Sequence, residues 1–193
     1  MSMLAAFADP VFDSQRNFRE LLQAMARPGT PRALPALPPS PPPATREAMA
    51  VLLTLCDQAT PVWLQQPDDA LAQHLRFHAG TPLVEMPAAA DFALITDARA
   101  LPPLHEFALG DPRYPDRSST LIVQVDGLRA GAGMRFAGPG IREVARCAID
   151  GLPDRFWHER AALAARLPLG LDCFFVAARQ VLALPRTTRL LED

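Results

Sequence analysis

The sequence contains no lysine, because all 19 of its basic residues are arginine. A GC-rich coding bias is the simplest origin of such a replacement, but the chemical consequence is the same whatever the cause. A guanidinium group stays protonated and cannot act as an amine nucleophile. The chain is therefore excluded from the enzymes that bind a cofactor as a Schiff base. It is also excluded from the P-loop proteins, whose phosphate loop requires lysine.

Cysteine is scarce as well, and the sequence lacks a basic excess and any long apolar run. Cys56, Cys147 and Cys173 lie far apart in apolar stretches, which predicts buried free thiols of a cytosolic protein. A formal net charge of -2 and a pI near 6.1 argue against a general nucleic-acid binder. The N-terminus has no signal-peptide pattern, and no segment approaches membrane length. We expect a soluble cytoplasmic protein without a membrane or nucleic-acid partner.

Proline, in contrast, is abundant: 21 of 193 residues, about twice the usual share of roughly 5%. Much of it lies between Pro28 and Pro43, where we expect a stiff, extended loop and no regular element. The remaining composition, 49% hydrophobic and 21% charged, is that of an ordinary folded protein. The length fits one domain over residues 1–193.

Apolar periodicity and turn residues divide the chain into alternating helices and strands. Phe18, Leu21, Leu22 and Met25 recur at helical spacing in the first helix. Helices are expected over residues 13–27, 45–55, 68–77, 103–109 and 154–166. Strands are expected over residues 60–64, 91–96, 120–125, 134–137, 144–149, 171–177 and 181–184. This order predicts an α/β domain with a mixed sheet, and the last two strands predict a hairpin.

Two glycine pairs invite comparison with phosphate-binding loops. Gly131 and Gly133 precede the strand at 134–137, and Gly138 and Gly140 follow it. A dinucleotide fingerprint needs a third glycine and a helix that opens from it, and Pro139 removes one backbone donor. We expect tight turns between strands, with a phosphate loop as the alternative.

His74 and His78 stand four residues apart, the spacing of two metal ligands on one face of a helix. A metalloprotease would need glutamate directly after the first histidine, where Leu75 stands. No third ligand is suggested nearby. We expect no metal site, and a structural or anion-facing role for the region of Arg76 and His78.

Two polar stretches rich in arginine border apolar strands. One contains Arg113 and Arg117 and leads into the strand at 120–125; the other contains Arg186, Thr187 and Thr188 and follows the last strand. Ligands gather at strand ends in open α/β sheets, and arginine with hydroxyl groups suits an oxyanion. The alternative is that the loop arginines pair with Asp111 or Asp116.

An ordered set of short motifs resembles the H subunit family of bacterial carbon–phosphorus lyase, from about residue 12 to residue 189. No single motif is diagnostic, but their order is specific. They are Asp13-Ser14-Gln15-x-x-Phe18-Arg19-x-Leu21-Leu22-x-Ala24-Met25-x-x-Pro28-Gly29, Leu53-Thr54-Leu55-x-Asp57-x-x-Thr60-Pro61-Val62-Trp63-Leu64, Leu75-Arg76-Phe77-His78, Pro115-Asp116-Arg117-Ser118-Ser119-Thr120-Leu121-Ile122, Gly138-Pro139-Gly140-Ile141, Pro168-Leu169-Gly170-Leu171-Asp172 and Pro185-Arg186-Thr187-Thr188.

The resemblance implies a three-layer mixed-sheet fold similar to that of pyridoxal-phosphate-dependent transferases, without that cofactor. It implies a homodimer in isolation and a core complex with the G, I and J subunits. That complex serves phosphonate catabolism, in which a phosphonate is attached to the ribose of ATP with loss of adenine. The expected role is a non-catalytic or accessory subunit; the alternative is an independent phosphonate- or nucleotide-binding enzyme. The family supplies no catalytic residues, so the candidate site is our own: Arg76, His78, Arg113, Arg117, Arg186, Thr187 and Thr188, holding an anion or an interface carboxylate.

Overall fold

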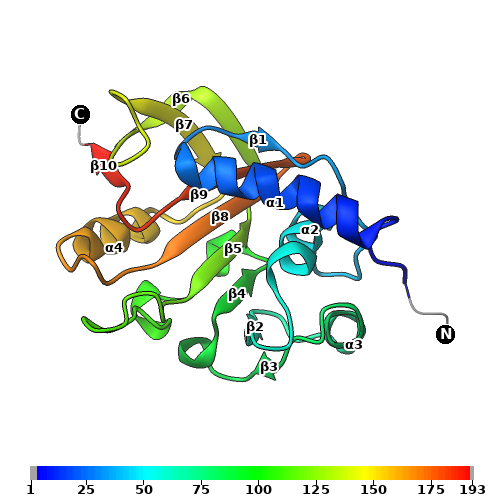
Figure 1. Ribbon diagram of the computed structural model, residues 1–193. Coiled ribbons are helices and arrows are strands. Elements are labelled where there is room, and N and C mark those ends of the chain that lie inside the picture. Colours follow the sequence, from blue (N-terminus) through cyan, green and yellow to red (C-terminus); the bar gives the residue numbers. More distant parts are fainter. Residues whose placement is uncertain (1–3, 192–193) are drawn as a thin grey trace.

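The computed structural model describes residues 4–191 and contains a central seven-stranded mixed sheet (Figure 1). Its order is β1-β9-β8-β5-β4-β2-β3. Strands β3, β2, β4, β5 and β8 are parallel to their neighbours, whereas β9 pairs antiparallel with β8 and with β1. Their bounds are Arg32–Ala33 (β1), Val62–Leu64 (β2), Leu83–Val84 (β3), Phe92–Ile95 (β4), Thr120–Gln124 (β5), Asp172–Ala177 (β8) and Gln180–Leu184 (β9).

Side chains of the central strands alternate between two hydrophobic clusters, one on each face of the sheet. On β5, Ile122 faces one cluster, while Leu121 and Val123 face the other. Successive strand residues point to opposite faces, so a strand buried on both sides is apolar throughout. This explains why the apolar runs at 120–125 and 171–177 were correctly predicted as strands.

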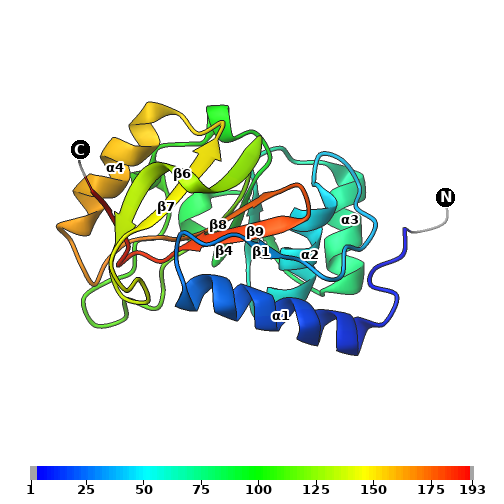
Figure 2. The ribbon, with the colours of Figure 1, turned by 90° about the horizontal axis from the view of Figure 1, so that it is seen from above.

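Three helices cover one face of the sheet (Figure 2). They are α1 (Pro10–Ala26), α2 (Arg46–Leu55) and α3 (Asp69–His78). Each begins at a residue whose side chain accepts a hydrogen bond from the first turn: Asp9, Thr45 and Asp68. The predicted helices at 13–27, 45–55 and 68–77 are thus confirmed, with small shifts at their ends.

A second sheet and a fourth helix cover the other face. The sheet is antiparallel, with the order β10-β6-β7. It consists of β6 (Gly127–Ala137), β7 (Ala145–Asp150) and β10 (Arg189–Leu191), and the helix is α4 (Asp154–Ala164). Short 3-10 turns lie at η1 (Pro87–Ala89), η2 (Ala98–Ala100) and η3 (Leu104–Glu106). The mixed α/β architecture is confirmed, and its layers are helices, mixed sheet, and small sheet with α4 (Figure 2).

Several local predictions were wrong. The glycines at 131 and 133 lie inside β6: Ala130 and Met134 both pair with Cys147, so residues 131–133 bulge out of the ladder. The expected helix at 103–109 is a single 3-10 turn, η3. The proline-rich segment contains β1, a two-residue edge strand, and its Leu34 is buried. Strands β3 and β10, with two and three residues, were not predicted.

The turn at Gly138–Gly140 does join β6 to β7, as expected. Gly140 has a positive φ of 82°, and a Cβ added there would lie 2.3 Å from the carbonyl oxygen of Ala26. This glycine therefore lets the turn touch the C-terminal end of α1. Cys56, Cys147 and Cys173 are all free and buried, as predicted. Within residues 4–191, no helix is long and apolar enough to cross a membrane.

Candidate functional site

The carboxyl ends of β2 and β4 are the first place to look for a ligand. After β2 the chain enters α3, whose Leu71 and Leu75 belong to the cluster on the helical face. After β4 it enters η2 and η3, whose apolar side chains belong to the opposite cluster. Such a divergence between parallel neighbours opens a crevice, which is the usual ligand site of open α/β sheets.

The side chain of Gln65 lies where such a crevice would open. Its Oε1 accepts hydrogen bonds from the backbone N–H groups of Thr96 (2.9 Å) and Asp97 (2.8 Å). Its Nε2 donates to the carbonyl oxygens of Asp97 (3.0 Å) and Ala100 (2.9 Å). The amide thus satisfies the backbone groups that would otherwise face a ligand there.

Gln124 plays the same part at the end of β5. Its Oε1 accepts from the backbone N–H of Thr45 (2.5 Å), and its Nε2 donates to the carbonyl oxygens of Pro43 and Thr96 (both 3.2 Å). The proline-rich segment is therefore joined to the end of β4. Both glutamine side chains therefore contact backbone groups at the carboxyl ends of the strands, where ligands usually bind in such sheets.

Arg186 lies at the opposite edge, where the parallel strands begin. Its guanidinium donates to both carboxylate oxygens of Asp172, the first residue of β8, with Nη2–Oδ2 at 2.6 Å and Nε–Oδ1 at 3.3 Å. Nη2 also reaches Ser118 Oγ (2.6 Å), and Nη1 reaches the carbonyl oxygen of Pro115 (2.5 Å). These bonds fasten the loop before β5 to the end of β9. Arg186 is fully engaged within the chain.

The two other arginines of that loop remain without an ion pair to a described residue. The Arg117 guanidinium carbon lies 4.1 Å from the centre of the Tyr114 ring, a cation–π contact. The Asp111 carboxylate accepts from the backbone N–H groups of Arg113 and Tyr114 instead. Pairing with Asp111 or Asp116, the alternative considered above, does not occur among residues 4–191.

Arg76 and His78 lie on α3, apart from the Arg186 network. His78 Nε2 lies 2.9 Å from the carbonyl oxygen of Leu4, and its ring packs against His74, with centroids 4.5 Å apart. Arg76 lines a separate open depression of about 380 Å³ beside Trp63 and Glu85. Among the described residues, no group of three or more His, Cys, Asp or Glu side chains could hold a metal ion.

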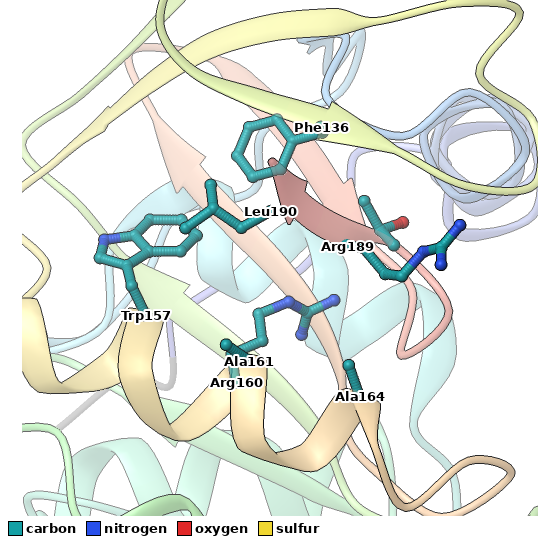
Figure 3. A pocket seen from close by; sticks show the side chains of 8 residues that line it. Phe136, Trp157, Arg160, Ala161, Ala164, Arg189 and Leu190 are labelled. Carbon is teal, nitrogen blue, oxygen red and sulfur yellow. The ribbon is translucent and has the colours of Figure 1, made fainter. Parts of the chain in front are cut away.

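A more enclosed cavity of about 210 Å³ lies between α4, β6 and β10 (Figure 3). Phe136 and Trp157 form its aromatic part, and Ala161 and Ala164 leave the space open along α4. Two arginines, Arg160 and Arg189, also line it, together with Thr188 and Leu190. The cavity is smaller than the roughly 300–1,000 Å³ typical of small-molecule sites, which excludes a nucleoside triphosphate as an enclosed ligand.

Arg160 gives this cavity its charge. It is buried on α4, and its guanidinium donates to the carbonyl oxygens of Leu171 (3.3 Å), Leu184 (3.0 Å) and Pro185 (2.5 Å). It forms no ion pair with a carboxylate of residues 4–191. Carbonyl dipoles, and no described carboxylate, therefore face this positive charge beside the cavity, where a small anion with an apolar group would be attracted.

Thr188, which the sequence had nominated, lines this cavity, whereas Arg160 was not among the nominated residues. The Thr188 hydroxyl oxygen is buried without a hydrogen-bond partner among the described residues, whereas Thr187 packs its backbone against Gly138. The available signal for Arg160 was its position, three residues after Trp157 and four after Phe156, on the apolar side of the helix. The structure thus separates the nominated residues: Arg76 and His78 lie on α3, Arg113 and Arg117 on the loop that Arg186 anchors, Thr187 beside Gly138, and Thr188 in the cavity.

The strand order defines a mixed α/β protein, and its described residues enclose a small cavity lined by two arginines. Comparison with known proteins places it more narrowly. The model of the bacterial phosphonate metabolism protein (PhnH) family matches residues 5–191, and the chain belongs to this family.

Two curated relatives agree with that assignment. The chain is similar to the alpha-D-ribose 1-methylphosphonate 5-triphosphate synthase subunit PhnH of Rhizobium meliloti (strain 1021), with 41% identity over 187 residues. That alignment covers 96% of this chain and 94% of the relative. It is also similar to the putative C-P lyase subunit protein HtxG of Stutzerimonas stutzeri, with 30% identity over 176 residues, 91% of this chain and 85% of the relative.

Proposed function

We propose that this chain is an accessory subunit of a carbon–phosphorus lyase core complex, in which it supports the transfer of an alkylphosphonate onto the ribose of ATP. The observation that carries the proposal is the near full-length similarity to a subunit of ribose 1-methylphosphonate 5-triphosphate synthase. Its partners would be the G, I and J subunits, its location the cytoplasm, and its isolated form a homodimer.

The closed strand ends support a role without a large active site of its own. The side-chain amides of Gln65 and Gln124 form hydrogen bonds with backbone groups at the strand ends. An α/β enzyme of this topology would bind its substrate there. We further propose that residues 1–193 form one domain related to the pyridoxal-phosphate-dependent transferases. With no lysine, the chain has no amine to attach that cofactor. The scaffold would then serve assembly.

The nominated side chains divide by role under this proposal. Arg186 holds the loop of residues 110–118, and Arg113 and Arg117 are carried on that loop, where they meet an anion or a partner's carboxylate. Arg76, His78 and Thr187 would contribute to contacts elsewhere, and Thr188 to the cavity. The cavity with Arg160 is the one observation that favours the alternative, a chain that binds a small phosphonate independently.

Coexpression with the G, I and J subunits tests the proposal. We expect the full-length chain to copurify with them, the complex to convert ATP and methylphosphonate, and the purified chain alone to show no turnover. Omitting the chain should abolish or strongly reduce turnover. Turnover by the chain alone would overturn the accessory role and support the alternative, as would a thermal shift with methylphosphonate in the absence of any complex.

The loop arginines are tested within the same complex by Arg113→Ala with Arg117→Ala. Both side chains lie outside the Arg186 network, so the fold should be preserved. We expect weaker assembly or turnover. Arg99→Ala is a matched control, because Arg99 is an exposed arginine that pairs with Asp126 at the other edge of the sheet. Equal assembly and turnover in the loop variant and the wild type would show that these two arginines do not belong to the functional site.

A further inference from the structure

Helix α1 buries two polar side chains and exposes four large apolar ones. Asp13 and Asn17 face the protein and are buried. Four large apolar side chains face outward instead, exposed to 73% (Val11), 62% (Phe12), 50% (Phe18) and 54% (Leu22). We call these four residues the outer α1 face. Buried polar groups together with an exposed apolar patch are the informative departures from normal burial.

The buried polar residues have a structural reason. Asn17 Nδ2 donates to the carbonyl oxygen of Ala36 (2.8 Å), and Asn17 Oδ1 accepts from the Ala36 N–H (3.1 Å). Asp13 accepts a hydrogen bond from the Asp9 N–H at the start of the helix (3.1 Å). The inner face of α1 therefore holds the proline-rich segment. No such internal explanation applies to the outer α1 face, which no element of residues 4–191 covers.

Three residues of the outer α1 face, with Gln15 between them, have the spacing of a helix-binding surface, which we call the seam. Val11, Gln15, Phe18 and Leu22 follow one another at intervals of four, three and four residues. Such spacing places side chains in one line along a helix, where they pack against a second helix. The sequence had suggested Phe18, Leu21, Leu22 and Met25 as one apolar set, but only Leu21 of these is fully buried.

One arginine beside the seam, Arg19, carries a positive charge that no carboxylate of the described residues neutralises. Arg16 and Arg19 are both exposed. The carboxylates of the same helix are engaged internally: Asp13 with Arg16, and Glu20 with Arg32 at 2.8 Å. Arg19 forms no ion pair with a described residue. A second copy packed antiparallel on this seam would bring the arginines of the two helices together, and like charges at an interface are unfavourable.

We propose that the outer α1 face binds an amphipathic helix of another subunit of the complex, one whose apolar stripe is bordered by aspartate or glutamate. This inference rests on the proposed function, since it requires a larger assembly. The partner's apolar side chains cover Val11, Phe18 and Leu22, and its carboxylates meet Arg19. The seam is distinct from the cavity and from the Arg186 network.

The test compares two pairs of substitutions at exposed apolar residues, in the full-length chain coexpressed with the G, I and J subunits. Phe18→Gln with Leu22→Gln alters the seam and keeps good helix-forming residues. Phe77→Gln with Met86→Gln is the matched control, because these side chains are 68% and 65% exposed elsewhere on the surface. Neither pair removes a buried side chain. Affinity is measured with the purified subcomplex of the other subunits, and oligomeric state by light scattering.

We expect the seam variant to bind the subcomplex roughly tenfold or more weakly, the control to bind like the wild type, and Arg19→Glu to bind more weakly than Arg19→Gln. Equal binding by the seam variant and the wild type would overturn this inference and leave the proposed function intact. A wild-type chain that does not bind the subcomplex at all would refute the proposed function itself. A seam variant that binds the subcomplex normally but loses self-association would assign the seam to a second copy, against the proposal.

Discussion

Arg186 and Asp172 form a two-point ion pair that joins the end of one strand to the start of its neighbour. Asp172 begins β8, and Arg186 follows β9, its antiparallel partner. The side chains are only 22% and 17% exposed for Asp172 and Arg186, respectively, and the same guanidinium reaches Ser118 and Pro115 in the loop before β5. This arrangement gives Arg186 a structural role, whereas the sequence pattern had suggested that Arg186 binds a ligand.

Replacement of Arg186 by alanine should destabilise the protein. The change leaves the half-buried Asp172 carboxylate without its cation and the loop without its anchor, a loss of about 3 kcal/mol in the free energy of unfolding. Urea denaturation measures it. Arg113→Ala, on the same loop but outside the network, should change the free energy by less than about 0.5 kcal/mol. Equal stabilities of the two variants would show that the network does not hold the loop.

The Gln65 amide should likewise contribute to stability and not to binding. Gln65→Ala leaves the N–H groups of Thr96 and Asp97 without their acceptor, so we expect a loss of about 2 kcal/mol. Gln66→Ala alters the exposed neighbour and should be neutral. If Gln65→Ala instead kept full stability and gained affinity for ATP, the crevice would be a ligand site that the glutamine blocks.

Gly140 should tolerate no side chain, whereas Gly131 should tolerate one at moderate cost. Both glycines have positive φ, so alanine carries a backbone penalty of roughly 1–2 kcal/mol at either position. At Gly140 the added methyl group also meets the Ala26 carbonyl oxygen, while at Gly131 nothing lies within 4 Å. Thermal unfolding of the two alanine variants measures the difference. A Gly140→Ala variant as stable as Gly131→Ala would argue against close packing of this turn on α1.

Strands were predicted correctly from the sequence where both of their faces are buried. The strands at 120–124 and 172–177 are buried on both faces, so their apolar runs identify them directly. Residues 131–133 were misassigned because glycine signals a turn, whereas here it forms a bulge in a long strand. Strands β1, β3 and β10 have only two or three residues and form by pairing with neighbouring strands. They are too short to show an alternating pattern in the sequence.

The candidate site was harder to predict because its contacts depend on tertiary structure. Arg186 was nominated for its hydroxyl neighbours, but the residues that engage it lie 14 and 68 positions away in the sequence, at Asp172 and Ser118. Gln65 and Gln124 carry no charge and belong to no motif, so nothing local indicated that they occupy the strand ends. Arg160 required knowledge of which side of α4 is buried. The orientation of α1 was missed because apolar spacing identifies a helix but does not tell which face meets the protein.

His74 should make the stability of the protein depend on pH. Its ring is 2% exposed, and neither ring nitrogen has a hydrogen-bond partner among the described residues. Burial, and next the neighbouring charge of His78, lower the pKa of His74 below its ordinary value of 6.5. The folded state therefore disfavours the protonated ring. Its stability is complete above pH 6.5 and falls as the pH decreases below that value, because the unfolded chain then binds a proton that the folded chain rejects.

Urea denaturation between pH 7.5 and 5.5 should show this loss, with a limiting slope of about 1.4 kcal/mol per pH unit for one such histidine. In His74→Phe the slope should become flatter by that contribution, because a phenyl ring binds no proton in either state. Gln73→Ala, a change at an exposed residue of the same helix that does not titrate, should keep the wild-type slope. Burial raises the pKa of Asp91, which acts in the opposite direction but equally in all three proteins. An unchanged slope in His74→Phe would mean that protonation of His74 is tolerated in the folded protein, for instance because its helix face opens to water.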